Sequence, residues 1–442
     1  MSDFFEKHRK SELCSVALTG EKMDYIECLK HEMIAAFGCT EPIALAYSAA
    51  RARAVLASEP DRITARLSGN MIKNANSVKV PGTQGRKGIA ISLACGAFLG
   101  DGDKELQVLE NIDKSRLPEM DRFIADGKIK VELKPDVPNL YIEIEEFSGN
   151  ESSKVVIEDS HTNITLIEKN GIPIFKKQVE TSAEEEQVEF SFEKIYDFAR
   201  NGDYSSLKPV LDKEIEYNTA IAEEGMKNEW GSSIGRILLK NNPGSFAETV
   251  TAYAAAGSDA RMSGCELPVV INSGSGNQGI TVSVPIIMYA REFNLSKEEL
   301  YSALVFANLI GLYLKQRIGK LSAYCGVVSA SSAAAAGIAF IKKEEPKIIQ
   351  ETLSNALAVN SGLICDGAKP SCAMKIASSL RNAMLAYEQA KEHKSFEAGD
   401  GIVMSDIEHT IAAVSRIAKD GMKSTDEVIL DEMIRSETQR AI

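Results

Sequence analysis

Three cysteines in the C-terminal part of the chain constrain its fold most, because each stands where a loop of small residues meets a helix-forming run. Cys325 precedes an Ala- and Ser-rich stretch, and Cys365 and Cys372 enclose a short loop that leads into a run containing Ala, Met and Leu. The amino terminus of a helix carries a partial positive charge, which lowers the pKa of a nearby thiol. Three thiolates placed in this way could hold a metal cluster and leave one corner of it free for a substrate.

The composition and charge of the chain indicate which kind of molecule it binds. The chain has 442 residues, of which 44% are hydrophobic and 26% charged, so it is long enough for two or three globular domains with substantial cores. Its formal net charge of −13 would repel both nucleic acid and anionic membranes. We therefore expect a small-molecule partner, with no nucleic acid and no membrane bound. A homodimer is compatible with the sequence.

Three features bear on the cellular compartment. The first ten residues lack the basic-then-apolar order of a secretory signal. The most apolar stretch, residues 303–314, is too short to span a bilayer. Eight cysteines in such a chain favour reduced thiols or metal ligands over a disulfide framework. These features predict a cytoplasmic protein.

Hydrophobic periodicity divides the chain into regions. The spacing of Tyr25, Leu29, Met33 and Phe37 predicts a helix that ends at Gly38. Between about residues 61 and 177, short β-rich runs are separated by Gly, Pro and Asn, whereas nearly every segment after residue 190 has helical periodicity. The expected strands of the middle region include 128–133, 140–145, 155–158 and 164–167, and its expected helices are 89–99 and 117–125.

These patterns predict an α+β fold. A mainly α-helical domain is expected to comprise residues 1–60 and 190–442, and a smaller α+β domain, residues 61–180, is expected to be inserted into it. The acidic segment 183–187 is interpreted as a connector between the two.

A fourth cysteine stands near the start of the chain. In the segment Gly38-Cys39-Thr40-Glu41-Pro42, Cys39 precedes a predicted helix that has a proline in its first turn. Such a position could make the Cys39 thiol a thiolate at neutral pH. The alternative is that Cys39 only packs, because unpaired cysteine is among the residue types most often buried.

A glycine-rich loop, residues 272–279, precedes an apolar helical run. Its exposed backbone N–H groups could bind an anion, and we expect Ser273, Gly274, Ser275, Gly276 and Asn277 to bind a substrate carboxylate. The loop lacks the Lys of a phosphate-binding P-loop, and no βαβ unit surrounds it as in a dinucleotide-binding fold. A flexible turn between helices is the alternative.

Two further polar segments are less informative. Residues 68–83 contain Asn70, Asn74 and Lys79, and their composition is that of a solvated loop. His161 lies at a predicted strand end, where an isolated histidine is more often structural than catalytic.

Taken together, four separated segments resemble one known family. Gly38–Pro42, Gly69–Asn74, Asn272–Gly279 and the three C-terminal cysteines are similar to the L-cysteine desulfidases, relatives of the iron-sulfur L-serine dehydratase alpha chain. The resemblance covers nearly the whole chain. Serine dehydratases show a longer gap between the last two cysteines than the six residues found here, which favours the desulfidase branch.

The resemblance implies a cofactor, a reaction and a set of site residues. It implies an oxygen-sensitive [4Fe-4S] cluster on Cys325, Cys365 and Cys372, with Cys39 as the base that removes the Cα proton. The implied reaction is β-elimination of L-cysteine to hydrogen sulfide, ammonia and pyruvate. The helical domain is then the catalytic, cluster-binding domain, and the α+β domain corresponds to the dehydratase beta portion. The expected substrate-binding residues are Asn70, Asn74, Lys79, His161, Ser273, Gly274, Ser275, Gly276 and Asn277.

Two alternatives remain at this level. One keeps the cluster but makes L-serine the main substrate. The other treats the three cysteines as a structural zinc site in a non-catalytic binding protein, although such sites normally have four protein ligands and no fourth Cys or His has suitable spacing. We expect Cys265 to be neither a fourth ligand nor a group behind the ligands, and Cys14, Cys28 and Cys95 to be packing residues.

Overall fold

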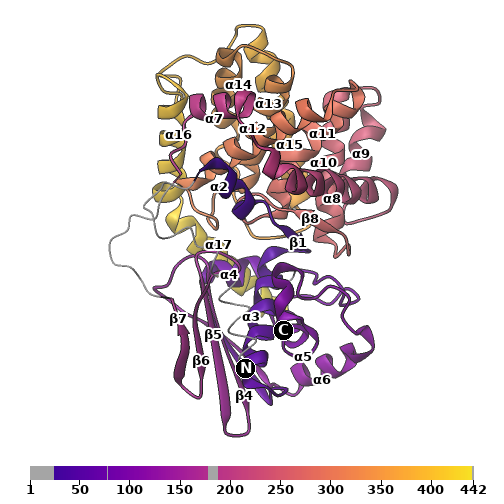
Figure 1. The fold of residues 1–442 in the computed structure, drawn as a ribbon, viewed down its shortest axis with the longest axis vertical. Coiled ribbons are helices and arrows are strands. Elements are labelled where there is room, and N and C mark those ends of the chain that lie inside the picture. The colour runs from indigo at the N-terminus through magenta and orange to yellow at the C-terminus, as the bar shows by residue number, and fades with distance from the viewer. Residues whose placement is uncertain (1–23, 77, 178–187, 441–442) are drawn as a thin grey trace.

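The computed structural model describes residues 24–76, 78–177 and 188–440, and it has the predicted α+β fold. A mixed sheet with its covering helices forms one end of the molecule, and a helical bundle forms the other (Figure 1). The acidic segment 183–187 and Cys14 lie outside the described residues. In the part of the chain that is described, no helix combines the length and the apolar character needed to cross a membrane.

The sheet has six strands in the order β3-β2-β4-β5-β6-β7, and only β2 and β3 are parallel. The four strands predicted from the sequence are confirmed, with β2 and β7 added to them. Ile142 and Ile144 of β4 are buried and alternate with glutamates, whereas the run Val155–Ile157 of β5 is buried throughout, and helix α3 packs on both strands. The bounds are β2 (Arg62–Leu67), β3 (Ile129–Leu133), β4 (Tyr141–Ser148), β5 (Glu151–Glu158), β6 (Ile164–Lys169) and β7 (Ile172–Lys176).

A close helix–helix contact fixes the position of α3 (Thr40–Leu56), whose first residue follows Cys39. Helix α5 (Ile89–Leu99) crosses α3 so closely that a Cβ on Gly96 would lie 2.2 Å from the Ala46 carbonyl oxygen. Only glycine allows this approach of the two backbones. Both α5 and α6 (Leu117–Ala125) have the bounds predicted from the sequence.

The helical end is built around α13 (Gly326–Ile341), which is buried along nearly its whole length. Its small side chains allow four helices to pack against it. These are α11 (Gly276–Glu292), α12 (Lys297–Gln316), α14 (Pro346–Asn360) and α15 (Cys372–Lys391). The other long elements are α2 (Tyr25–Glu32), α4 (Gly69–Ala75), α7 (Phe192–Asn201), α8 (Lys208–Lys227), α9 (Ile234–Asn241), α10 (Phe246–Met262), α16 (Ile407–Arg416) and α17 (Lys423–Arg440).

A short antiparallel pair, β1 (Ala35–Phe37) and β8 (Pro268–Val270), corrects one prediction. The helix expected to reach Phe37 ends at Glu32, because the residues that follow pair with β8 instead. Pairing with a distant strand overrides the local periodicity. Arg261 links the Cys39 segment to the glycine-rich loop, since its guanidinium donates to the Gly38 carbonyl oxygen and to Asn277 Oδ1.

The expected solvated loop at 68–83 is also wrong in part. Ser68 caps α4 by accepting a hydrogen bond from the Met71 N–H, and most of the helix is buried. The C-terminal helix α17 covers it, so that a Cβ on Gly69 would lie 2.9 Å from Leu430. The domain boundaries at 60/61 and 180/190 remain a prediction, with α3 and α17 packing against elements of the 61–180 segment.

The α3–α5 contact can be tested by adding one methyl group. We expect Gly96→Ala to lower the free energy of unfolding by about 1–3 kcal/mol, because neither backbone can move without disturbing the core. Gly362→Ala is the matched control, since a Cβ there meets no atom of the described residues within 4 Å. Urea unfolding followed by circular dichroism measures both; equal stability of the two variants would contradict the packing.

Candidate active site

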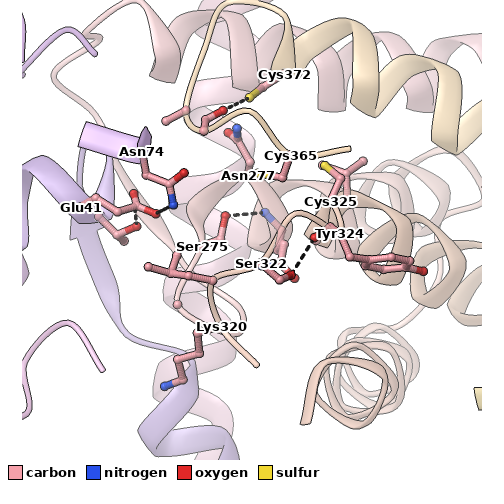
Figure 2. Close-up of a pocket in the computed structure, with 18 of the residues that line it drawn as sticks. Glu41, Asn74, Ser275, Asn277, Lys320, Ser322, Tyr324, Cys325, Cys365 and Cys372 are labelled. Atoms are coloured by element: carbon pink, nitrogen blue, oxygen red, sulfur yellow. Dashed lines mark hydrogen bonds between the residues drawn. The ribbon is translucent and has the colours of Figure 1, made fainter. Parts of the chain in front are cut away.

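A small cavity of about 80 Å³ lies where the two ends of the molecule meet. Its walls come from the start of α3, from α4, from the glycine-rich loop and from the segments that carry the three C-terminal cysteines. Figure 2 shows Glu41 and Asn74 on one side and Cys325 and Cys365 on the other. Residues far apart in the sequence thus line one cavity.

All three cysteines line this cavity. Cys325 is the N-cap of α13 and Cys372 is the first residue of α15, as expected from their place before helix-forming runs. Cys365 lies in the intervening loop, whose backbone pairs with that of Cys325 over a short ladder: the Cys325 N–H donates to Leu363 and the Cys365 N–H to Ala323.

The pKa values of the three thiols differ. A hydrogen bond from Cys325 lowers the pKa of Cys365 to about 6 and raises that of Cys325. Burial raises the pKa of Cys372 to about 11. The uniform lowering expected from the helix termini is therefore wrong, because loss of hydration outweighs the helix dipole in a buried site. A bound cation would reverse this balance, since a coordinated thiol is deprotonated.

Three ammonium groups surround the cysteines. Lys73 Nζ donates to the Cys365 carbonyl oxygen at 3.2 Å, and Lys375 Nζ donates to the Ile364 carbonyl oxygen at 3.1 Å. Lys315 is only 4% exposed, lines the cavity, and makes no hydrogen bond or ion pair within the described part of the chain. Burial lowers the pKa of Lys315 to about 8, while Cys365 and Cys325 act to raise it.

This donor set fits an iron-sulfur cluster. Three thiolates and a cluster carry negative charge, and buried charge must be compensated nearby; an unpartnered buried ammonium such as Lys315 supplies that. Among the described residues, no three His, Cys, Asp or Glu side chains converge as they would around one metal ion. In a cubane each thiolate bonds a different iron, so convergence is not required.

Cys39 lies behind the cavity wall, with its neighbour Thr40 on the lining. It is 1% exposed and packs with Met262 and Cys372. Burial raises the pKa of Cys39 to about 12, with Arg261 acting in the opposite direction. The thiolate expected at neutral pH is thus not the resting form, because desolvation exceeds the effect of the helix terminus and the guanidinium.

The glycine-rich loop ends at the first turn of α11, which Ser275 caps. Arg261, on α10, is 3% exposed and lines the same part of the cavity. Its guanidinium donates to Asn277 Oδ1 at 3.2 Å and to the Gly38 carbonyl oxygen at 2.9 Å, whereas its Nε–H has no acceptor among the described residues. A Cβ on Gly276 would lie 2.4 Å from Nε, so glycine is required there. The helix terminus and guanidinium together form an anion-binding corner.

A buried hydrogen-bond chain holds this loop from behind. Asn308 Nδ2 donates to both Glu214 carboxylate oxygens, Asn272 Nδ2 donates to Asn308 Oδ1 at 2.9 Å, and Ser273 Oγ donates to Asn272 Oδ1 at 2.9 Å. All four side chains are buried. Burial raises the pKa of Glu214 to about 8, so the carboxyl is mostly protonated at neutral pH.

The predicted substrate-binding residues fall into two groups. Those on the cavity lining are Asn74, Gly274, Ser275 and Asn277. Those outside it are Asn70, Lys79, His161, Ser273 and Gly276. His161 packs closely against Gly274; its Nε2 has no partner in the described structure, and burial lowers its pKa to about 4, which keeps the ring neutral.

The sequence reasoning did not single out several lining residues. Among them are Glu41, Arg261, Lys315 and Lys320. Arg261 lies in α10 and Lys315 in α12, and the sequence of a helix does not indicate which of its faces lines a cavity. Glu41 had a local signal, because it belongs to the quoted segment around Cys39.

The comparisons with known proteins agree with this architecture. Residues 103–431 match the family model described as serine dehydratase alpha chain, and the protein belongs to that family. A UPF0597 protein of Finegoldia magna is 44% identical over 93% of this chain and 99% of its own. UPF0597 proteins of Desulfitobacterium hafniense and Treponema denticola are 45% and 40% identical, each over 93% of this chain and 96% and 97% of their own.

The buried Glu214 predicts a pH dependence of stability. Its pKa rises from 4.5 in the unfolded chain to about 8 in the fold, so its contribution is fully present below pH 4.5 and is lost as pH rises toward 8. Glu214→Gln keeps an acceptor for Asn308 and cannot ionise. We expect the free energy of unfolding of the wild type, obtained from thermal melts, to fall relative to that of this variant as pH rises from 5 to 8. The expected fall is up to about 1.4 kcal/mol per pH unit. Parallel curves would contradict the burial of a protonated Glu214.

Proposed function

We propose that the protein is an iron-sulfur-dependent lyase that releases sulfide from L-cysteine by β-elimination. The observation that carries the proposal is the meeting of three cysteine side chains and an anion-binding corner on one small cavity. Membership of the serine dehydratase alpha chain family supports elimination chemistry on a small amino acid.

The chain's own residues bind and orient the substrate. The first turn of α11 and the Arg261 guanidinium hold the substrate carboxylate, because both present N–H donors and positive charge to the cavity. Cys39 packs against Cys372, and the Arg261 guanidinium donates to the carbonyl oxygen of its neighbour Gly38.

Cys325, Cys365 and Cys372 would hold the cluster. When bound, a [4Fe-4S] cluster with three protein ligands supplies an open iron position that acts as a Lewis acid toward the leaving sulfur. Cys39 is the proposed base: its buried thiol must first lose its own proton, and the thiolate then accepts the Cα proton. The C–H electron pair forms the Cα=Cβ bond, and sulfide leaves with the C–S pair. The aminoacrylate product tautomerises and is hydrolysed to pyruvate and ammonia without further help from the protein.

L-serine is the second candidate substrate. The matched family is described by serine dehydratase, and a hydroxyl differs from a thiol by one atom at the leaving position. The same residues would bind L-serine, with water leaving in place of sulfide.

The cytoplasm is the proposed location, because a reducing compartment keeps such thiols and such a cluster intact. A homodimer remains a prediction.

Anaerobic purification tests the cofactor and its ligands. We expect iron and acid-labile sulfide in the wild type, with pyruvate formed from L-cysteine. Replacing Cys325, Cys365 or Cys372 by Ala should remove iron and activity together. Cys39→Ala should keep the iron and lower kcat by about 10²–10⁴-fold, as expected for loss of a general base.

Cys95→Ala is the matched control for these variants, since Cys95 is a buried thiol on α5 that does not line the cavity. Its iron content and turnover should stay near those of the wild type. Full activity in iron-free protein would end the proposal, and loss of iron from Cys39→Ala would show that Cys39 is a ligand instead.

Substrate preference is measured separately. We expect kcat/KM for L-cysteine to exceed that for L-serine, with sulfide and pyruvate released in equal amounts, because the softer sulfur binds an iron-sulfur iron better than a hydroxyl does. Initial rates of sulfide, ammonia and pyruvate release on each amino acid give the ratio. A higher kcat/KM for L-serine would assign the chain to the dehydratase reaction.

A further inference from the structure

Glu41 is the one acidic residue among the described residues that line the cavity. It lies in the first turn of α3, two residues after Cys39. Thr40 Oγ1 donates to its Oε2 at 3.1 Å, and Asn74 Nδ2 donates to its Oε1 at 3.3 Å. Two donors from different elements therefore fix the orientation of this carboxylate (Figure 2).

Within the described part of the chain, no cation forms an ion pair with Glu41. The nearby Lys320 pairs with Glu32 at 2.9 Å, and Arg261 is engaged by Asn277 and Gly38. A carboxylate has about four lone-pair positions, and the two donors leave the others open. A partly buried negative charge that is oriented but lacks a counter-ion is a binding site for a cationic group.

The position of Glu41 relative to Cys39 defines which cation it would bind. Glu41 follows Cys39 by two residues in the first turn of α3, and the Arg261 guanidinium donates to the carbonyl oxygen of Gly38, the residue before Cys39. An α-amino acid carries its carboxylate and its ammonium on the same carbon that loses the proton. A carboxylate held at Arg261 and an ammonium held at Glu41 would bring that carbon next to Cys39.

We propose that Glu41 binds the α-ammonium group of the substrate and thereby restricts the enzyme to free α-amino acids. This inference rests on the proposed function for its substrate and adds the group that recognises the amine. Acids without the ammonium, such as propionate or 3-mercaptopropionate, lack a partner for Glu41. Amino acids with an acylated nitrogen lose the positive charge.

Calorimetric titration of the anaerobically purified, cluster-containing protein tests this assignment. L-alanine serves as the probe with an ammonium, and propionate as the matched probe without one; neither has a leaving group. We expect the wild type to bind L-alanine more tightly than propionate. Glu41→Gln should weaken L-alanine binding by about tenfold or more, the loss of a charge-assisted hydrogen bond, and leave propionate binding unchanged.

Kinetics on L-cysteine supply a second readout. Glu41→Gln should raise KM more than it lowers kcat, because the lost contact holds the substrate in the ground state as well as in the transition state. Glu41→Asp keeps the negative charge, so its KM should lie between that of the wild type and that of Glu41→Gln. Glu298→Gln is the control, since Glu298 also lies in the first turn of a helix, α12, and is exposed outside the cavity.

The outcomes separate this inference from the proposed function. Equal loss of L-alanine and propionate affinity in Glu41→Gln, or a fall in kcat at unchanged KM, would overturn the role of Glu41 while turnover of L-cysteine by the wild type upholds the function. If the wild type binds L-alanine, Glu41→Gln weakens that binding, and the wild type has no lyase activity, the role of Glu41 is upheld and the proposed function is overturned. Circular dichroism and iron content confirm that each variant is folded and loaded.

Discussion

The short backbone ladder between residues 323–325 and 363–365 is the contact on which the candidate site depends. Its two hydrogen bonds, Cys325 N–H to Leu363 and Cys365 N–H to Ala323, place two thiols side by side at the head of α13. Cys372 follows at the start of α15, which packs against α13. Because α13 is surrounded by four helices, the relative positions of the thiols are set by the core.

Charge balance is the second constraint. The three cysteines line the cavity with Lys315, while Lys73 and Lys375 donate to the carbonyl oxygens of Cys365 and Ile364. Glu41 and Arg261 line the cavity near the Cys39 segment. Buried charges of one sign are costly unless an opposite charge lies nearby, so each group requires a partner from the protein or from a ligand. Lys315 and Glu41 have none among the described residues, and these two therefore indicate what the cavity binds.

The sequence predicted those parts of the site that have a local pattern. The cysteines and the glycine-rich loop were found because small residues precede helix starts, and helices α5 and α6 because their periodicity is strong. Arg261 and Lys315 were missed because only tertiary packing turns them toward the cavity. The helix expected to reach Phe37 was wrong because pairing with β8 is a long-range interaction, and the expected Cys39 thiolate was wrong because burial is invisible in sequence.

In the proposed site, three thiols hold a cluster whose fourth iron is free for the substrate. Mössbauer spectroscopy of the anaerobic, iron-57-enriched protein tests it most directly, with and without L-cysteine. We expect one iron site that differs from the other three and whose Mössbauer parameters change when L-cysteine is added. Four irons that remain unaffected by L-cysteine, or iron present only as single ions, would contradict it.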